Sequence, residues 1–262
     1  MTTDATPTGS LLAALVERVT AHADDELVLG HRDAEWTGHA PLLEEDIALA
    51  NLAQDEIGHA ITWYGVRSGL DGSDPDRLVY FRGADEYRSS HLVALPRGDW
   101  AFTMLRQYLF DAYETELLAR LARSSYQPLA QAAVKIAREE LFHLRHSALW
   151  LERLAHGTDE SRRRLTAALD ELLPLLPGLL APLPGDAALA AAGVYPEAAE
   201  LADAVLARVG AALEAAGLAR PTLEPPADAA GADRRQRPDG VLAALLAEMQ
   251  SVARSDPQAE GW

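Results

Sequence analysis

The sequence predicts an all-α protein in which a bundle of four long helices is followed by additional C-terminal helices. Apolar residues recur at intervals of three and four over segments at about 11–31, 41–68, 99–123 and 128–156, which is the period of a helix with one buried face. The segment 70–96 is rich in Gly, Asp, Ser, Pro and Arg and has no sustained periodicity. We therefore expect two helical hairpins joined by one long crossover.

Residues that favour helix ends support these boundaries. Ser10 can cap the first helix and Asp99 the third, because short polar side chains accept hydrogen bonds from first-turn amides. Pro41 suits the first position of the second helix, where its missing N–H is not needed. Gly69 is the expected C-terminal stop of that helix.

The chain beyond the bundle is also expected to be helical. A fifth helix at 161–180 is interrupted or ended by its two prolines. A sixth helix is expected at 197–218 and a last one at 241–254. The polar, Gly-rich stretch 227–240 between them is expected to be mobile.

Length and composition limit the classes of function. A chain of 262 residues can bury one large core, and we interpret residues 1–262 as a single domain, with the bundle at about 11–156 and a helical extension at about 158–262. A net charge of −17 disfavours nucleic acid and anionic membranes as partners. The absence of cysteine excludes thiolate metal sites and iron–sulfur clusters in this chain. With no apolar run of ~18 residues and no N-terminal signal pattern, a soluble cytoplasmic protein is expected.

Two Glu-x-x-His quartets are the strongest functional signal in the sequence. Glu56 with His59, and Glu140 with His143, each place a carboxylate and an imidazole on one face of a helix. Two such helices, with one carboxylate from each of two others, form the di-metal site of ferritin-like bundles. Carboxylate and imidazole ligands suit iron or manganese. The alternative is a charged helix surface beside a partly buried histidine.

The remaining ligands would come from the first and third helices. Glu26 and Asp111 precede the two quartet glutamates by 30 and 29 positions, and these near-equal separations suit two pseudo-equivalent hairpins. Asp33 and Glu114 lie on the same two helices and are competing choices. Glu26 could instead be solvated beside two neighbouring aspartates. Asp111 could instead be a buried hydrogen-bond partner of a quartet histidine.

A shared site requires the second and fourth helices to face each other. We expect the apolar residues Ile47, Leu52, Val134 and Leu141 to be buried between them. Carboxylate oxygens of the two quartet glutamates more than ~10 Å apart would exclude a shared site, since the metals of a di-metal centre lie about 4 Å apart.

Three runs of residues resemble a known family. The runs LVLGHRDAEWTGHAPLLEEDIALANLAQDEIGHA and FHLRHSALWLERLAHGTDES, and LLAEMQSVARSDP before Trp262, are similar to the C subunit of the bacterial phenylacetyl-CoA epoxidase. The resemblance implies a ferritin-like fold over nearly the whole chain. It also implies a multicomponent monooxygenase of phenylacetate degradation, which inserts oxygen into the ring of phenylacetyl-CoA to give a 1,2-epoxide.

The resemblance also implies partners and cofactors. The C subunit pairs with a homologous catalytic A subunit that holds the di-iron centre and the CoA thioester, in a heterodimer or a larger assembly. A small B subunit bridges heterodimers, and a reductase with FAD and an iron–sulfur cluster supplies electrons from NADPH. The C subunit itself is implied to be a structural partner that requires no cofactor.

Departures from the family pattern keep other interpretations open. Both quartets are intact, although the C subunit is expected to have lost ligands, and Leu52 stands where the catalytic subunit is expected to have a lysine. Trp36, His39 and Pro41 are interpreted as interface or packing residues, as are the neighbouring His31 and Arg32. The leading interpretation is a structural subunit with no catalytic residues and at most weak metal binding, inactive alone. The alternatives are a redox-active di-iron subunit and a ferritin-like iron or peroxide protein.

Overall fold

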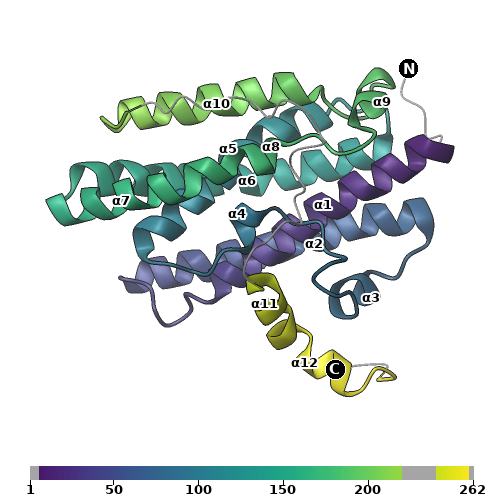
Figure 1. Cartoon of the computed structure of the whole chain (residues 1–262), viewed down its shortest axis with the longest axis horizontal. Helices are drawn as coiled ribbons and strands as arrows, with labels where there is room; N and C mark the ends of the chain where they lie inside the picture. Colours follow the sequence, from purple (N-terminus) through teal and green to yellow (C-terminus); the bar gives the residue numbers. More distant parts are fainter. Residues whose placement is uncertain (1–5, 220–239, 260–262) are drawn as a thin grey trace.

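The computed structural model describes residues 6–219 and 240–259, and it is all-α, with no strand in these two ranges (Figure 1). The predicted mobile stretch 227–240 lies outside the described residues except for Gly240, and Trp262 lies outside them as well. No helix among the described residues combines the length and the apolar character needed to cross a membrane.

The four long helices predicted from the sequence are present. They are α1 (Gly9–Ala34), α2 (Leu43–Asp71), α5 (Trp100–Leu121) and α6 (Gln127–His156). Helix α1 packs along α2, α5 packs along α6, and α2 lies beside α6. Two hairpins joined by one long crossover make this a ferritin-like bundle, as predicted.

Two predicted ends of α2 are wrong. The helix begins at Leu43 rather than Pro41, because Leu42 has extended backbone angles and the Gly38 amide donates to Asp46 Oδ1 at 2.6 Å, which holds the preceding loop against the first turn. The helix passes through Gly69 and ends before Gly72, whose φ of 74° is the left-handed conformation that glycine adopts at low cost.

The predicted caps of the other helices have mixed outcomes. Asp99 caps α5 as expected, since its Oδ1 accepts from the Phe102 amide at 2.9 Å. Ser10 does not cap α1, because the helix begins at Gly9, two residues before the start that a Ser10 cap predicts, and Thr8 is the capping residue.

The crossover contains two short helices that periodicity could not show, α3 (Pro75–Tyr80) and α4 (His91–Ala94). Buried carboxylates of α1 hold it in place. Asp24 pairs with Arg82, and Asp25 Oδ1 accepts from the Ser90 amide at 2.6 Å. The long connection is therefore a fixed part of the core.

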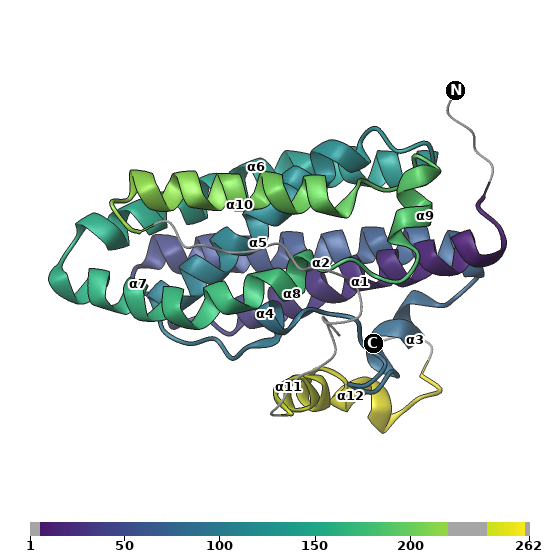
Figure 2. The ribbon, with the colours of Figure 1, turned by 45° about the horizontal axis from the view of Figure 1, so that its top comes forward.

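The described part of the C-terminal extension is helical, as predicted, but the helix at 186–191 was not expected, and the helix expected at 241–254 is divided at Gln250. The extension contains α7 (Asp159–Leu172), the 3₁₀ turn η1 (Leu173–Leu175), α8 (Leu176–Leu180), α9 (Asp186–Ala191), α10 (Ala198–Ala215), α11 (Val241–Met249) and α12 (Ser251–Ser255). Helices α7 and α10 pack against α5, as Figure 2 shows. Near the end of the chain, Gln250 and Arg254 donate to carbonyl groups of residues 79–82, so α12 lies beside α3.

The predicted burial of the α2 and α6 apolar residues is largely wrong. Leu52 is buried, but Ile47, Val134 and Leu141 are 55%, 46% and 66% exposed. The inner faces of α2 and α6 carry the quartet side chains. The three exposed residues lie on the outer faces of the same helices, where no described element covers them.

A buried ion pair joins the extension to the bundle. Arg18 of α1 pairs with Asp186 at the start of α9, both side chains are 4% exposed, and Arg18 Nε donates to Asp186 Oδ1 at 3.1 Å. Asp186 also accepts from the Leu183 amide at 2.7 Å, which fixes the turn before α9.

We expect Asp186→Ala to lower the free energy of unfolding by about 3–5 kcal/mol, because it leaves the Arg18 guanidinium buried and unpaired. The exposed pair between Arg163 and Glu160 provides the control. Arg163→Ala should leave the stability nearly unchanged, because solvent screens an exposed ion pair. Urea denaturation followed by circular dichroism measures both variants, and equal effects would contradict a structural role for the buried pair.

Candidate metal centre

Seven ligand-type side chains meet inside the bundle. Each is at most 2% exposed. They are Glu26 from α1, Glu56 and His59 from α2, Asp111 and Glu114 from α5, and Glu140 and His143 from α6. All six residues of the predicted constellation thus point into one space. Glu114, one of the two competing choices, lies there as well.

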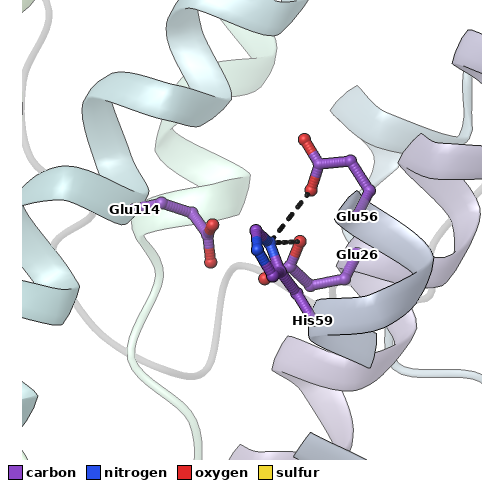
Figure 3. A group of neighbouring side chains, drawn as sticks. All are labelled: Glu26, Glu56, His59 and Glu114. Carbon is purple, nitrogen blue, oxygen red and sulfur yellow. Dashed lines mark ion pairs between the residues drawn. The ribbon is translucent and has the colours of Figure 1, made fainter. Parts of the chain in front are cut away.

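The side chains form two overlapping groups that share Glu56. In the first group, one ligand atom from each of Glu26, Glu56, His59 and Glu114 lies within 4.8 Å of the others (Figure 3). In the second group, Glu56 joins Asp111 and His143 on the same criterion. Two groups with a common carboxylate have the arrangement of a di-metal site with a bridging ligand.

Glu140 also lies between the two groups. Its Oε1 is 2.8 Å from His143 Nδ1 and 3.5 Å from His59 Nδ1. Glu56 Oε1 is 3.5 Å from the same His143 nitrogen. The two glutamates therefore lie well within the ~10 Å that would have excluded a shared site.

Close packing of α1 and α2 sets the depth of Glu56. A side chain on Gly30 would place its Cβ 3.0 Å from the Ala53 carbonyl oxygen and 3.0 Å from Glu56 Cβ. The glycine therefore lets the two helices approach at the level of the shared ligand. The quartet spacing then brings His59 one turn further along, onto the same face.

The two histidines are oriented by acidic residues of the opposite helix. His59 Nε2 lies 2.8 Å from Glu139 Oε2, and His143 Nε2 lies 3.3 Å from Asp55 Oδ2. An Nε2–H donated to a carboxylate leaves Nδ1 of each ring free to face the cluster, which is how second-sphere carboxylates orient metal-binding histidines. The sequence reasoning missed Asp55 and Glu139. Their signal is an acidic residue directly before the glutamate of each quartet.

Three polar side chains support the carboxylates, and sequence reasoning did not identify them. Gln107 Nε2 donates to Glu56 Oε1 at 2.9 Å and to Asp111 Oδ1 at 2.8 Å. Ser147 Oγ donates to Asp111 Oδ2 at 2.6 Å. The indole N–H of Trp63 donates to Glu26 Oε1 at 3.3 Å.

The other residues considered from the sequence lie apart from the two groups. Asp33 is buried and 3.4 Å from Arg106, and burial raises its pKa to about 7. Trp36 is a buried packing residue that donates to Thr103, whereas His39 and Pro41 are exposed.

Sequence reasoning treated Asp111 and Glu114 as alternatives, but the structure brings both into the cluster, each beside a different histidine. They are three residues apart on α5 and so share one face. The solvated alternative for Glu26 is contradicted by its burial, and the aspartates beside it are buried as well.

Crowded carboxylates shift the pKa values of the cluster. Burial, followed by repulsion from neighbouring carboxylates, raises the pKa of Glu26, Glu114 and Asp111 well above the ordinary range, and burial also raises that of Glu140. Burial opposes ionisation of Glu56, but its contacts with Glu26 and both histidines hold its pKa well below the ordinary value. Burial likewise opposes the charged form of His59, but Glu56 and other carboxylates raise its pKa to about 9. Without cations, the cluster therefore retains protons.

The unpaired polar atoms of the cluster fit bound cations. Among the described residues, Glu114 Oε2 and Glu140 Oε2 are buried without a hydrogen-bond partner. Nδ1 of His59 and of His143 make no well-aligned hydrogen bond, but each lies within ion-pair distance of cluster carboxylates. Unpaired buried polar atoms are costly. Here they converge on one space, and a carboxylate-rich set with one imidazole per group suits iron or manganese.

A surface groove of about 410 Å³ reaches the cluster between α2 and α6. His143, Asp55 and Leu52 line it, together with Phe142 and Leu149. Leu52 occupies the position where the family resemblance implies a catalytic lysine. An apolar side chain there offers no proton or hydrogen bond to a ligand in the groove.

We expect the free energy of unfolding of the metal-free chain to fall as pH rises from 6.5 to 9, by on the order of 3 kcal/mol from His59. The unfolded imidazole loses its proton near 6.5, whereas the folded one keeps it to about 9. Its stabilisation is thus complete below pH 6.5 and lost by pH 9. The raised carboxyl pKa values act in the same direction. The lowered pKa of Glu56 stabilises the fold at every pH in this window.

Urea titrations of chelator-treated protein at both pH values measure this fall. His59→Gln should reduce it, and His39→Gln, at an exposed position, should leave it unchanged. A stability that is the same at pH 6.5 and 9 would show that His59 carries no proton in the folded state.

Comparisons with known proteins agree with this architecture. The family model described as "Phenylacetic acid catabolic protein" matches residues 1–262. The chain is 41% identical over 150 residues to the C subunit of the Escherichia coli 1,2-phenylacetyl-CoA epoxidase, covering 57% of this chain and 60% of that protein. It is 29% identical over 157 residues to the A subunit of the same enzyme, covering 60% of this chain and 50% of that protein. Both matches span less than two thirds of the relative's length. Since the family model covers the whole sequence, the chain belongs to the phenylacetic acid catabolic protein family.

Proposed function

We propose that this chain is the C-type subunit of a phenylacetyl-CoA epoxidase and supports a homologous catalytic A-type subunit. The identity to the E. coli C subunit is greater than that to the A subunit, which supports this assignment. In this proposal the assembled complex inserts oxygen into the ring of phenylacetyl-CoA to give the 1,2-epoxide. A small B-type subunit and a reductase that uses NADPH, FAD and an iron–sulfur cluster complete the system.

The observation that carries the proposal is an uncovered apolar face on α2 and α6. Its members are between 45% and 72% exposed: Leu43, Ile47, Ile61, Val134, Leu141, Phe142 and Leu149. Large apolar side chains gathered on one face of a protein mark an interaction site. The groove beside His143 opens onto the same face.

A homologous helical subunit fits this face because long helices pack best on long helices. α2 and α6 lie side by side and offer ridges of large side chains with grooves at Gly58, Gly65 and Gly69, where a Cβ would meet nothing within 4 Å. A partner seated here would cover the outer side of the metal centre and the mouth of the groove.

The subunit keeps a metal centre of its own in this proposal. Glu26, Glu114 and His59 would hold one cation, Asp111 and His143 a second, and Glu56 and Glu140 would lie between them. A pair of reduced iron ions in such a set supplies oxygen-activating chemistry. This chain's residues hold the ions, orient the imidazoles and keep the site dry, and Leu52 brings no proton donor to it.

A second candidate is a redox-active di-iron subunit, and the inward-facing, unpaired ligand atoms favour it. A free-standing ferritin-like protein whose main role is iron storage or peroxide consumption is less well supported, because the extension packs over the α5 side of the bundle and is longer than such a protein needs.

We expect Leu141→Asp combined with Phe142→Asp to prevent co-purification with the A-type subunit, because both charges would be buried in the interface. Val252→Asp is the control, since Val252 is 62% exposed but lies on α12. Size-exclusion chromatography of the co-expressed proteins measures the complex. A double variant that still assembles would place the interface elsewhere.

We expect Glu56→Gln to abolish binding at both metal positions, because Glu56 belongs to both groups, whereas Asp111→Asn should weaken only one. The wild-type chain should bind about two ions of Fe²⁺ or Mn²⁺. Equilibrium dialysis followed by elemental analysis measures the stoichiometry. Glu152→Gln, at an exposed position on α6, is the control.

The same variant separates the two candidate functions. In the reconstituted complex, Glu56→Gln should leave phenylacetyl-CoA epoxidation largely intact, and the chain alone should show no epoxidation. Loss of epoxidation with assembly preserved would instead establish the redox-active subunit.

A further inference from the structure

A column of buried rings begins at the metal centre and leads into the extension. Trp63 is fully buried and its indole N–H donates to Glu26 Oε1 at 3.3 Å. The ring of His22, one turn from Glu26 on α1, lies 5.6 Å from the Trp63 ring between centroids. The His22 ring also lies near the Tyr195 ring, with centroids 5.8 Å apart and planes 20° apart.

Hydrogen bonds connect both ends of this column to proton acceptors. Tyr195 OH lies 3.1 Å from His22 Nε2, and the phenol donates in the tautomer that carries the imidazole proton on Nδ1. At the other end, Glu26 accepts the indole proton. Each ring that can lose an electron therefore has an acceptor for the proton it must also lose.

The surroundings hold Tyr195 in this position. The Arg18 guanidinium lies over its ring, 4.9 Å from the centroid, and is fixed by Asp186. Burial raises the pKa of Tyr195 well above its ordinary value. The phenol is therefore neutral, and its oxidation must release a proton to a neighbour.

We propose that Trp63, His22 and Tyr195 form a relay that removes an oxidising equivalent from the carboxylate cluster and stores it as a tyrosyl radical on Tyr195. The proposal rests on the metal centre proposed above. It assigns the chain an activity beyond support of a partner: it reduces peroxide with one electron from ferrous iron and one from its own side chains.

The electrons and protons of this step balance. Reduction of one hydrogen peroxide molecule to two water molecules consumes two electrons and two protons. With ferrous iron bound by the cluster, the metal would supply one electron, and Trp63 supplies the other. The indole proton passes to Glu26, and the two protons consumed come from solvent.

Tyr195 then re-reduces Trp63. The electron passes between the two rings across His22, Glu26 returns the proton to the indole nitrogen, and the phenolic proton passes to His22 Nε2. The net change is one ferric ion and one tyrosyl radical for each peroxide reduced.

A second group of aromatic residues supplies the matched control. Trp100 lies 5.0 Å from Trp36 and 5.1 Å from Trp150 between ring centroids. Trp36 donates to Thr103 and Trp150 to Glu45, so neither of these indoles donates to a carboxylate of the metal centre. If the relay runs only through the rings beside Glu26, a substitution in this second aromatic group should not change the radical that forms.

The test uses the full chain loaded anaerobically with ferrous iron, mixed with one equivalent of hydrogen peroxide and freeze-quenched for electron paramagnetic resonance. The wild-type chain and Trp100→Phe should give a tyrosyl signal. Tyr195→Phe should lose that signal and give a tryptophan-type radical, and Trp63→Phe should lose both. Peptide mass spectrometry of the same samples should find oxidation at Trp63 and Tyr195.

The outcomes separate this inference from the proposed metal centre, because iron content and thermal unfolding are measured on every sample. Bound iron with an unchanged tyrosyl signal in Tyr195→Phe would overturn the relay and leave the metal centre standing. A wild-type chain that binds no iron would overturn both. Since Tyr195→Phe removes only a hydroxyl group, it keeps the test decisive if Trp63→Phe fails to fold.

Discussion

Five carboxylates and two imidazoles share one buried space, and the repulsion among the carboxylates is the constraint on which the rest of the structure depends. Coulomb energies between like charges at these separations are large wherever water is excluded. The bundle can hold the cluster only if protons or cations neutralise it. Protons can neutralise the charge and let neighbouring carboxyl groups hydrogen-bond to one another, as Glu26 does with Glu56 and Glu114, and two cations could neutralise it as well.

The two hairpins contribute equivalent residues to the cluster. Each contributes a quartet, and the acidic residue before each quartet orients the histidine of the other, through Asp55 and Glu139. This crosswise pairing couples α2 to α6 through polar contacts near the surface. The residues on the outer faces of α2 and α6 do not take part in the cluster. Those faces carry the uncovered apolar residues. One pair of helices thus supplies both quartets of candidate metal ligands and the proposed interface.

Periodicity was sufficient to predict the long helices and the ferritin-like bundle, because each helix buries a full face against a neighbour. It could not show α3 or α4, which are too short to display a period and are held by Asp24 and Asp25 of α1. It also failed for Ile47, Val134 and Leu141, because an apolar residue on a helix does not reveal whether the chain itself or a partner covers it. Spacing identified the quartets, but symmetry between the hairpins wrongly set Asp111 against Glu114.

The extension matters to the metal centre more than its distance along the chain indicates. The turn after α9 places Tyr195 against His22. The Arg18–Asp186 pair joins the start of α9 to α1, and the same Arg18 guanidinium lies over the Tyr195 ring. A polar pair this deeply buried contributes little net stability. Its value lies in fixing one ring position relative to the bundle. An oxygen- or peroxide-exposed metal centre inside an irreplaceable core risks oxidising its own ligands, and a ring column that ends in the extension moves that oxidation away from them. In a supporting subunit, which has no substrate of its own to oxidise, such an outlet is needed more than in a catalytic one.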